Sequence, residues 1–490
     1  MFKWRALAVA LRARVLYRAR HGMECATVDY RPCCVDKPKV PDPVFDRALQ
    51  VPDFQALWWV RPQKQLGFER PAPCARQTTE NLSYRLREIE LDTRAPIPLK
   101  IALVANTSWY LHNFRPTLMD ALQQEGHEVV AVAPQDAYSR KLVEAGFVHH
   151  HIPLDQRSIN PVRALHSILH LRRVLRDERI DAVLSFTPKG NIYSGLAISD
   201  PSVTFVANLS GLGRAFSQNS RLLGLAAMGF RWAFRRATAV LFQNGDDLRL
   251  LVNRGIVDPA KAQRIPGSGV DLQRFSFRNC MRGDENVEFL FVGRLLWEKG
   301  IGEFAGAARE LKSRYPNIRF RVLGPLQEGP AGVSRSTIDA WTEEGIIDYL
   351  GVAEDVRKAM EEADCIVLPS YYNEGVPRSL LEASALGRPI ITTDMAGCRD
   401  AVCDSVTGYL CKPRDIEGLV STLEKFLSLT VHERAEMGRR AREKMEREFD
   451  ETFVIDQYKG LVSRTTSRNA SSTSAMAVAR SRQGLRKIRR

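Results

Sequence analysis

Two glutamates, Glu374 and Glu382, have the residue type and the spacing that most directly suggest chemistry in this chain. They lie eight positions apart, on either side of a predicted junction between a loop and a helix. Asp364 to Pro369 is a short apolar run of strand length, and turn residues follow it as far as Pro377. Leucines and alanines then recur at helical spacing from Arg378 to Leu386. This pattern predicts the strand, loop and helix of a βαβ unit.

This junction suits an anion with sugar hydroxyls beside it. Pro377 fits a first helical position, so the free N–H groups of the next residues carry the positive end of the helix dipole. An anion is favoured there. Glu374 precedes the helix and Glu382 lies inside it, where their carboxylates could accept hydrogen bonds from sugar or ribose hydroxyls. The alternative is that Glu374 is a solvated loop acid and Glu382 a surface helix residue.

Two cations follow another predicted strand. Val287 to Gly293 is apolar, and it runs into Arg294 and Lys299 before an amphipathic helix from Ile301 to Arg314. Both cations therefore belong at the carboxyl edge of a parallel sheet, where ligands bind in open α/β folds. Two cations beside a helix N-terminus suit a diphosphate.

The segments VGRLLWEKG and NEGVPRSLLEASALGRP, with the spacing of the two glutamates, resemble family 4 of the retaining glycosyltransferases. The resemblance covers about Lys100 to Gly460 and implies an α/β GT-B fold, in which two doubly wound Rossmann-like domains face each other across a cleft. Arg294 and Lys299 would then hold the donor diphosphate, Glu382 the ribose, and Glu374 the donor sugar near its reacting carbon. The implied donor-binding residues are Arg294, Lys299, Glu374, Gly375, Val376 and Glu382.

The first half of the chain carries weaker signals of the same kind. Gly211 and Gly213 lie in a turn after a predicted strand, and Lys189 and Arg115 also follow strands. Taken singly, these residues could be a structural turn and two solvated loop cations. Together with their neighbours they resemble a bacterial subgroup that extends polyprenyl-diphosphate-linked sugars, including N-acetylgalactosaminyltransferases. By that resemblance all four residues lie on the acceptor side or at the cleft. The matching segments are NTSWYLHNFRP, TPKGNIYSGLA, NLSGLGRAF, LFQNGDD, PGSGVD and VLGPLQEG.

Strands and helices alternate along the chain, which predicts two parallel doubly wound sheets. The predicted strands of the first sheet are residues 100–106, 128–133, 182–185, 203–207 and 239–242. Those of the second are residues 287–293, 320–323, 348–350, 365–368 and 390–392. We expect an N-terminal extension, partly disordered or amphipathic (1–97), an acceptor-side domain (98–274), a nucleotide-sugar-binding domain (275–463) and a basic disordered tail (464–490). By resemblance, the final helices, 431–449 and 451–463, pack across the two domains.

The mechanism is expected to be independent of metal and of any cofactor. The chain holds no Asp-x-Asp triplet to bridge a metal to the diphosphate. Cationic side chains and N–H groups at a helix end would stabilise the leaving nucleoside diphosphate instead. The family retains anomeric configuration, either through an enzyme nucleophile or by front-face attack. We favour front-face attack, with Glu374 as the catalytic contact to the sugar and the leaving diphosphate as the base.

The net charge of +14 is confined to the two ends of the chain. Residues 1–23 hold six cations and no acid, and residues 464–490 hold eight cations and no acid. The remainder is neutral, so a nucleic-acid partner has little support. The basic ends match an anionic membrane surface, at about 1 kcal/mol per juxtamembrane cation, although a pair of solvated disordered tails is the alternative.

The N-terminal segment does not predict a membrane span. Phe2 to Arg20 interleaves apolar residues with arginines, which is typical of a helix lying on a membrane. No run of 18 apolar residues occurs anywhere in the chain. Leu222 to Arg236 is apolar with a basic end, and it could be a packed core helix or a contact with the acceptor lipid or the membrane.

Neither the cysteines nor the histidines predict a metal site. The nine cysteines form neither a zinc pattern nor a disulfide framework, which favours a reducing compartment. His149, His150 and His151 lie in a predicted strand, where alternate side chains point to opposite faces and cannot converge on one ion.

These observations lead to one functional hypothesis with two alternatives. We expect a glycosyltransferase on the cytoplasmic face of the membrane, peripheral on its inner surface. It would move a hexose or N-acetylhexosamine from a UDP-sugar to a lipid-diphosphate-linked saccharide. The alternatives are the same transfer to a soluble acceptor, and a catalytically inactive GT-B scaffold in a glycan-assembly complex.

Overall fold

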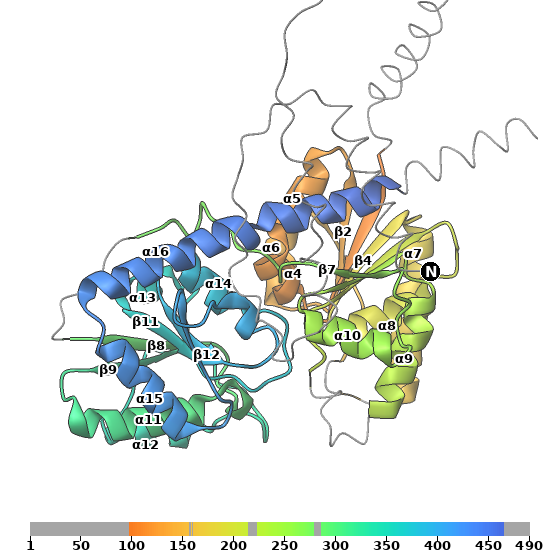
Figure 1. Ribbon diagram of the computed structural model, residues 1–490. Coiled ribbons are helices and arrows are strands. Elements are labelled where there is room, and N and C mark those ends of the chain that lie inside the picture. The colour runs from red at the N-terminus through yellow and green to blue at the C-terminus, as the bar shows by residue number, and fades with distance from the viewer. Residues whose placement is uncertain (1–97, 156–157, 159, 214–222, 279–285, 465–490) are drawn as a thin grey trace, which may run out of the picture. The chain divides into compact units, whose positions relative to one another are not determined.

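The structure is a computed structural model, and it describes residues 98–155, 158, 160–213, 223–278 and 286–464 (Figure 1). Our predictions for residues 1–97 and for the basic tail beyond residue 464 lie outside the described residues.

The first sheet has seven parallel strands in the order β3-β2-β1-β4-β5-β6-β7. Its strands are β1 (Lys100–Val104), β2 (Glu128–Ala133), β3 (Val148–His151), β4 (Ala182–Phe186), β5 (Thr204–Leu209), β6 (Ala239–Phe242) and β7 (Ala262–Arg264). The helices between them are α4 (Ser108–Phe114), α5 (Pro116–Gln124), α6 (Ala137–Glu144), α7 (Pro161–Asp177), α8 (Pro188–Ala197), α9 (Leu223–Arg235) and α10 (Gly245–Asn253).

The second sheet has six parallel strands in the order β10-β9-β8-β11-β12-β13. Its strands are β8 (Glu288–Val292), β9 (Arg319–Leu323), β10 (Asp348–Tyr349), β11 (Cys365–Leu368), β12 (Ile390–Thr393) and β13 (Gly408–Cys411). Its helices are the short 3₁₀ turns η3 (Trp297–Lys299) and η4 (Arg399–Ala401), with α11 (Ile301–Arg314), α12 (Arg335–Glu343), α13 (Arg357–Glu362), α14 (Arg378–Ala385), α15 (Ile416–Leu427) and α16 (Val431–Glu448).

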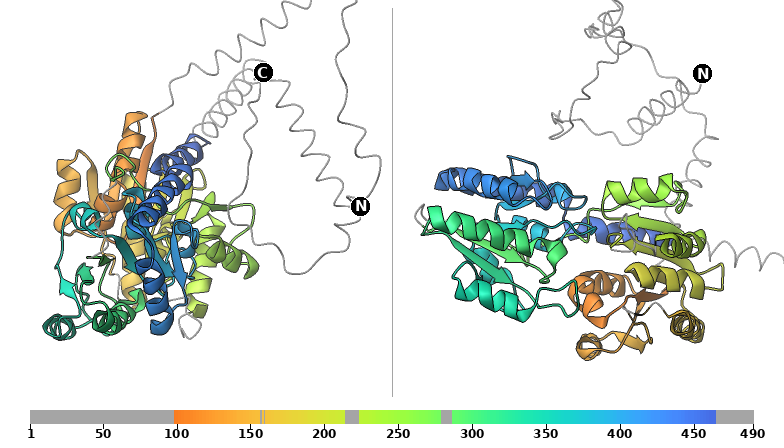
Figure 2. Two further views of the ribbon diagram at one scale, coloured as in Figure 1. Left: turned by 60° about the vertical axis from the view of Figure 1, so that its left-hand side comes forward. Right: turned by 90° about the horizontal axis from the view of Figure 1, so that it is seen from below.

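The central strands are buried because helices cover both faces of each sheet. Every residue of β4, β5, β8 and β11 is buried, as expected for strands covered on both sides. Figure 2 shows the two sheets with their helices from two further directions. The prediction of two doubly wound parallel sheets is therefore confirmed.

The strand order of each sheet changes direction at one point. In the first sheet β1 pairs with β4, and in the second β8 pairs with β11. The loops after β8 and β11 therefore leave the same edge of the sheet side by side. A loop pair of this kind is where doubly wound folds bind their ligands.

Helices α7, α8 and α9 pack side by side, α8 contacting both of the others. Each helix connects one strand to the next strand of the chain, β3 to β4, β4 to β5 and β5 to β6. In all three connections the chain moves across the sheet in the same direction, towards β7. The right-handed rule for such crossovers therefore puts all three on one face. Gly195 of α8 lets α9 approach closely, since a Cβ on Gly195 would lie 2.6 Å from the Cα of Ala233.

The final described helix, residues 451–464, belongs to the core of the first sheet although it follows the second sheet in sequence. Tyr458 is fully buried there, and its hydroxyl accepts a hydrogen bond of 2.6 Å from Nδ2 of Asn208. The residues of this helix in that core are Val454, Ile455, Tyr458, Leu461 and Val462.

Candidate active site

Lys299 and Glu374 form a close, largely buried ion pair. The Nζ of Lys299 lies 2.6 Å from Oε1 and 2.5 Å from Oε2 of Glu374. Their side chains are only 10% and 14% exposed, so solvent screens the pair weakly. The hydroxyl of Ser370 donates a third hydrogen bond, of 2.9 Å, to Oε1 of Glu374. The Glu374 carboxylate is thus held in one orientation by neighbours on two loops.

The pair forms because its two loops leave neighbouring strands. Lys299 ends the η3 turn after β8, and Glu374 lies in the loop after β11. The loops approach each other at Gly300, which has φ +79°, where a Cβ would collide with the carbonyl group of Pro369. Glycine is required there for both its backbone angle and its lack of a side chain.

Arg294 and the start of α14 belong to the same two strand-to-helix connections as Lys299 and Glu374. Arg294 follows β8 and is exposed, and the N-terminus of α14 after Pro377 has no side-chain cap. A helix N-terminus without a cap presents free N–H groups that favour an anion. We predicted Pro377 at the first helical position, but the structure places it one residue earlier, as the N-cap residue.

Glu382 lies inside α14 and pairs with a residue of its own helix. Its Oε1 accepts a hydrogen bond of 3.1 Å from Nε of Arg378. Burial raises the pKa of the Glu382 carboxyl group, and the charge of Arg378 opposes that shift. The guanidinium of Arg378 also lies 5.2 Å from the ring centroid of Phe114 in the first domain.

The backbone around Glu374 touches the glycine turn of the first domain. The N–H of Gly375 donates to the carbonyl of Ser210 at 2.9 Å, and the N–H of Gly213 donates to the carbonyl of Asn373 at 2.8 Å. Gly211 has φ +110°, and a Cβ on it would lie 2.5 Å from the Cα of Glu374. The two predicted glycines therefore fit the turn closely against the Glu374 loop.

A second loop of the first domain, after β6, also contacts the Glu374 loop. Nδ2 of Asn244 lies 3.4 Å from the carbonyl oxygen of Glu374, and it donates a shorter bond of 2.9 Å to Oδ2 of Asp247. A Cβ on Gly375 would collide with the side chain of Gln243. Val376 is also buried, and the backbone of Gly267 packs against it.

The side chains of Ser370, Gln243 and Asn244 contact Glu374 or its loop, and these residues were absent from the predicted site. Asn244 is the N-cap residue of α10, and this capping role alone explains an asparagine at the position. Ser370 directly follows a predicted strand at the carboxyl edge, which is the one signal that could have suggested it.

Arg115 and Lys189 lie elsewhere in the first domain. Arg115 is buried, with its guanidinium 4.5 Å from the ring centroid of Phe186 and a 3.1 Å hydrogen bond to the hydroxyl of Tyr110. Nζ of Lys189 donates to the carbonyls of Asp155 and Ser158, both at 2.6 Å. Among the described residues, neither side chain hydrogen-bonds to Glu374 or Lys299.

The three consecutive histidines contact three different groups. The Nε2 of His149 lies 2.9 Å from Oγ of Ser108, Nδ1 of His151 accepts a bond from the backbone N–H of Gln135, and Nε2 of His150 lies 3.0 Å from Glu178. Their side chains thus diverge, as the alternation along a strand predicts.

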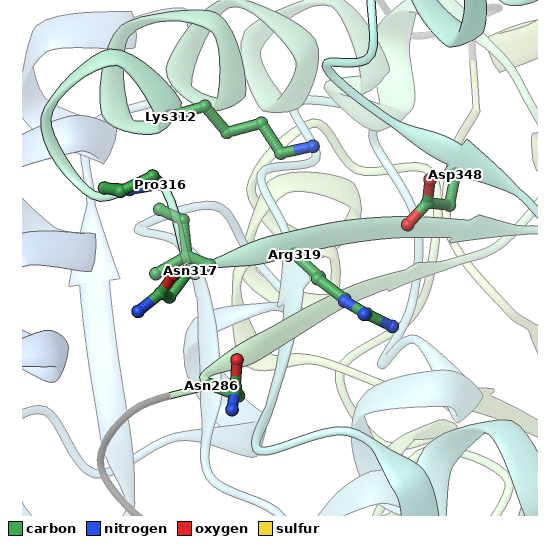
Figure 3. Close-up of a pocket in the computed structure, with 7 residues that line it drawn as sticks. Asn286, Lys312, Pro316, Asn317, Arg319 and Asp348 are labelled. Carbon is green, nitrogen blue, oxygen red and sulfur yellow. The ribbon is translucent and has the colours of Figure 1, made fainter.

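A polar hollow of about 500 Å³ lies at the other edge of the second sheet (Figure 3). Its lining includes Arg319 and Asp348, the first residues of β9 and β10. The hollow is therefore at the amino ends of the strands, whereas Lys299 and Glu374 follow carboxyl ends. We assign it no part in the site.

Two family descriptions match the chain, one on each sheet. "Glycosyl transferases group 1" matches residues 275–444, and "Glycosyl transferase 4-like domain" matches residues 116–267. The chain belongs to the family 4 glycosyltransferases of the GT-B fold.

Relatives and a solved structure agree with this family. The glycosyltransferase is 26% identical, over 67% of its own length and 89% of the relative's, to the N,N'-diacetylbacillosaminyl-diphospho-undecaprenol alpha-1,3-N-acetylgalactosaminyltransferase of Campylobacter jejuni. It is 25% identical, over 63% and 82%, to the UDP-Gal:alpha-D-GlcNAc-diphosphoundecaprenol alpha-1,3-galactosyltransferase of Escherichia coli. A crystal structure of a glycosyltransferase from Rickettsia africae shares the fold, with a TM-score of 0.62 at 17% identity over 75% of this chain and 98% of that one.

In the described part of the glycosyltransferase, no helix combines the length and the apolar character needed to cross a bilayer.

Asp247, the partner of Asn244, gives a prediction about stability. Burial raises the pKa of Asp247 to about 6, and the hydrogen bond from Asn244 opposes the shift. An unfolded aspartate titrates near 3.9. The folded chain therefore binds this proton more tightly, so the contribution of Asp247 to stability falls as the pH rises from about 4 to about 6.

We expect Asp247→Asn to remove this cost. At pH 8 the variant should unfold at a higher temperature than the wild type, by the equivalent of roughly 1–3 kcal/mol. The difference should shrink towards pH 4. Thermal unfolding of both proteins across this range measures it, with the exposed Asp348→Asn as the control. An advantage that is the same at pH 4 and pH 8 would contradict the assignment.

Proposed function

We propose that this glycosyltransferase transfers a hexose or N-acetylhexosamine from a UDP-sugar to a polyprenyl-diphosphate-linked saccharide during surface-glycan assembly. The names of two relatives support the acceptor class, since both act on saccharides linked to undecaprenyl diphosphate. The name of the second relative gives UDP-Gal as its donor, which supports a UDP-sugar donor here.

The observation that carries the proposal is the Lys299–Glu374 pair at the point where the strand order changes direction. A carboxylate and an ammonium held together in a partly dry site can bind two neighbouring parts of a nucleotide-sugar, the hydroxyl groups of the sugar and the diphosphate. Arg294 and the free N–H groups at the start of α14 add positive charge for the diphosphate. Glu382 would accept hydrogen bonds from the ribose.

The proposed chemistry is front-face substitution with retention of configuration. The bond between the anomeric carbon and the diphosphate oxygen breaks, and its electron pair leaves with the diphosphate. The acceptor hydroxyl attacks the same face and gives its proton to that oxygen. Glu374 holds the sugar, while Lys299 and Arg294 stabilise the charge that develops on the leaving group, with no metal required.

The first domain would supply the acceptor side. Gly211 and Gly213 form the turn against the Glu374 loop, and Arg115 and Lys189 belong to the same domain. We propose that the enzyme works on the inner face of the membrane as a peripheral protein, because its lipid-linked acceptor would reside there. The cations of residues 1–23 and 464–490 would attract anionic lipids.

The proposal is tested by incubating the full chain with a panel of UDP-sugars and short-chain polyprenyl-diphosphate sugars. The expected result is a product whose mass exceeds that of the lipid acceptor by one hexose or N-acetylhexosamine residue. Transfer to free saccharides alone would replace the acceptor class with a soluble one. Transfer to neither, with no hydrolysis of any donor, would favour an inactive scaffold.

A further inference from the structure

Helix α9 exposes large apolar side chains on its outer face. Met228 is 54% exposed and Trp232 is 59% exposed, and they lie four residues apart on one side of the helix. The opposite side of α9 packs into the core of the first sheet through Phe230, Ala233 and Phe234. The helix is thus apolar on both faces. Packing into the core accounts for the inner face, but it does not explain why Met228 and Trp232 are apolar on the outer face.

The exposed side of α9 is also positively charged. Arg231 and Arg235 are exposed and flank Trp232, and the guanidinium of Arg235 lies 5.9 Å from the ring centroid of Trp232. The helix contains no aspartate or glutamate. Neither arginine forms an ion pair with the described residues. Apolar and cationic groups are therefore presented together, as on helices that lie in a membrane interface.

Helix α7 adds a second apolar stripe on the same side of the sheet. Val162, Leu165 and Leu169 are 74%, 57% and 51% exposed, and their spacing places them on one face of α7. Both α7 and α9 pack against α8 (Figure 1). We call the outer surface formed by Val162, Leu165, Leu169, Met228 and Trp232 the α7/α9 face.

We propose that the α7/α9 face docks on a bilayer that contains anionic lipid. The apolar side chains would enter the boundary between headgroups and acyl chains, while Arg231 and Arg235 would bind lipid phosphates. Tryptophan suits this boundary because its ring is apolar and its N–H is polar. The inference rests on the peripheral location proposed above and names the face that meets the membrane, and it needs neither a donor nor an acceptor.

Charge decides between a bilayer and a second copy of the chain as the occupant of this face. Two copies meeting through the same face would bring the arginines of one α9 towards those of the other, and like charges oppose that contact. An anionic bilayer offers the opposite charge over its whole surface.

The test is co-sedimentation of the full chain with vesicles of phosphatidylcholine alone, or of phosphatidylcholine and phosphatidylglycerol in equal parts. We expect the wild type to bind the mixed vesicles and Met228→Ser/Trp232→Ser to bind them at least tenfold more weakly. The control variant, Val352→Ser/Phe453→Ser, removes two exposed apolar side chains elsewhere and should bind like the wild type. Circular dichroism and thermal unfolding check that all three proteins fold.

High salt separates this face from the basic ends of the chain. In about 1 M NaCl the Debye length falls to about 3 Å, so attraction through the ends and through Arg231 and Arg235 is screened, and the apolar side chains of the face remain to hold the chain on the vesicle. Binding that persists there in the wild type, and disappears in the Met228→Ser/Trp232→Ser variant, supports the proposal. Equal binding by the variant and the wild type, or no binding by the wild type, overturns it. A serine variant that changes the mass of the protein in solution and leaves vesicle binding unchanged would identify a second copy as the occupant.

Because vesicle binding is measured without sugar transfer, its failure would leave the proposed transfer reaction standing, although a wild type that binds no vesicles would contradict the proposed peripheral location. Conversely, absence of transfer would leave the docking result unchanged.

Discussion

Replacing Glu374 with glutamine is expected to lower kcat for sugar transfer by about 10²–10³-fold, the scale of removing one preorganised charged or hydrogen-bonding group. The glutamine keeps the shape of the side chain and the hydrogen bond from Ser370 but loses the negative charge. Lys299 then loses its partner at 2.5 Å. A lysine without its partner attracts a diphosphate more strongly, so we expect the loss in kcat and no increase in KM for the donor.

A double-variant cycle with Lys299→Met distinguishes a paired role from two separate ones. Residues that act as a unit give strongly non-additive losses, so the double variant should be little worse than the more damaging single variant. Glu417→Gln changes an exposed glutamate at the start of α15 and serves as the control for loss of one charge. Wild-type turnover by Glu374→Gln would rule out the assigned role, provided that its thermal unfolding shows a folded protein.

Replacing Gly211 with alanine is expected to lower activity by about 10²-fold, because a shift of about 1 Å near a reacting centre has effects of that size. The new Cβ would lie 2.5 Å from the Cα of Glu374 and 2.6 Å from the N of Gly375, well inside contact distance. Both atoms are backbone, so no side chain can rotate away. The Glu374 loop must move, and the bond from Gly375 to Ser210 must lengthen or break.

Gly146→Ala is the matched control for this prediction. Gly146 also has a positive φ, +91°, but nothing lies within 4 Å of the Cβ that alanine would add. Both variants carry the strain of a left-handed alanine, roughly 1–2 kcal/mol. Only Gly211→Ala meets the Glu374 loop. Thermal unfolding should therefore show backbone strain in both variants and a further loss of stability in Gly211→Ala. Rates of transfer should fall only in Gly211→Ala, and equal activity in the two variants would contradict a positioning role for Gly211.

The predicted site residues of the second domain follow from the sequence because the residues next to each of them in the chain are enough to place it. Arg294, Lys299 and Glu374 each lie in the connection that follows a buried apolar run, and parallel strands deliver such connections to one edge. The adjacency of β8 and β11 is not local information, yet it brings Lys299 and Glu374 within hydrogen-bonding distance. The sequence alone suggested two separate ligands, and the structure shows one ion pair.

The contacts between domains could not be predicted from spacing. Asn244 and Ser210 meet the Glu374 loop across 130 or more positions of the chain, and nothing in their residue types announces that contact. Two edge strands, β7 and β13, were also not predicted. β7 is only three residues long, with no buried residue, so it lacks the apolar run that reveals a central strand.

The helix of residues 451–464 has a consequence for the order in which the protein matures on the ribosome. Domains commonly fold in turn as they emerge, the first one first. Here Tyr458 and its neighbours fill the core beneath a sheet whose last strand, β7, ends at Arg264. At about 5–20 residues per second, the first domain would wait on the order of 10–40 s for them, while the second is being made. A nascent chain of this enzyme would carry an open apolar surface through that interval, a natural target for chaperones.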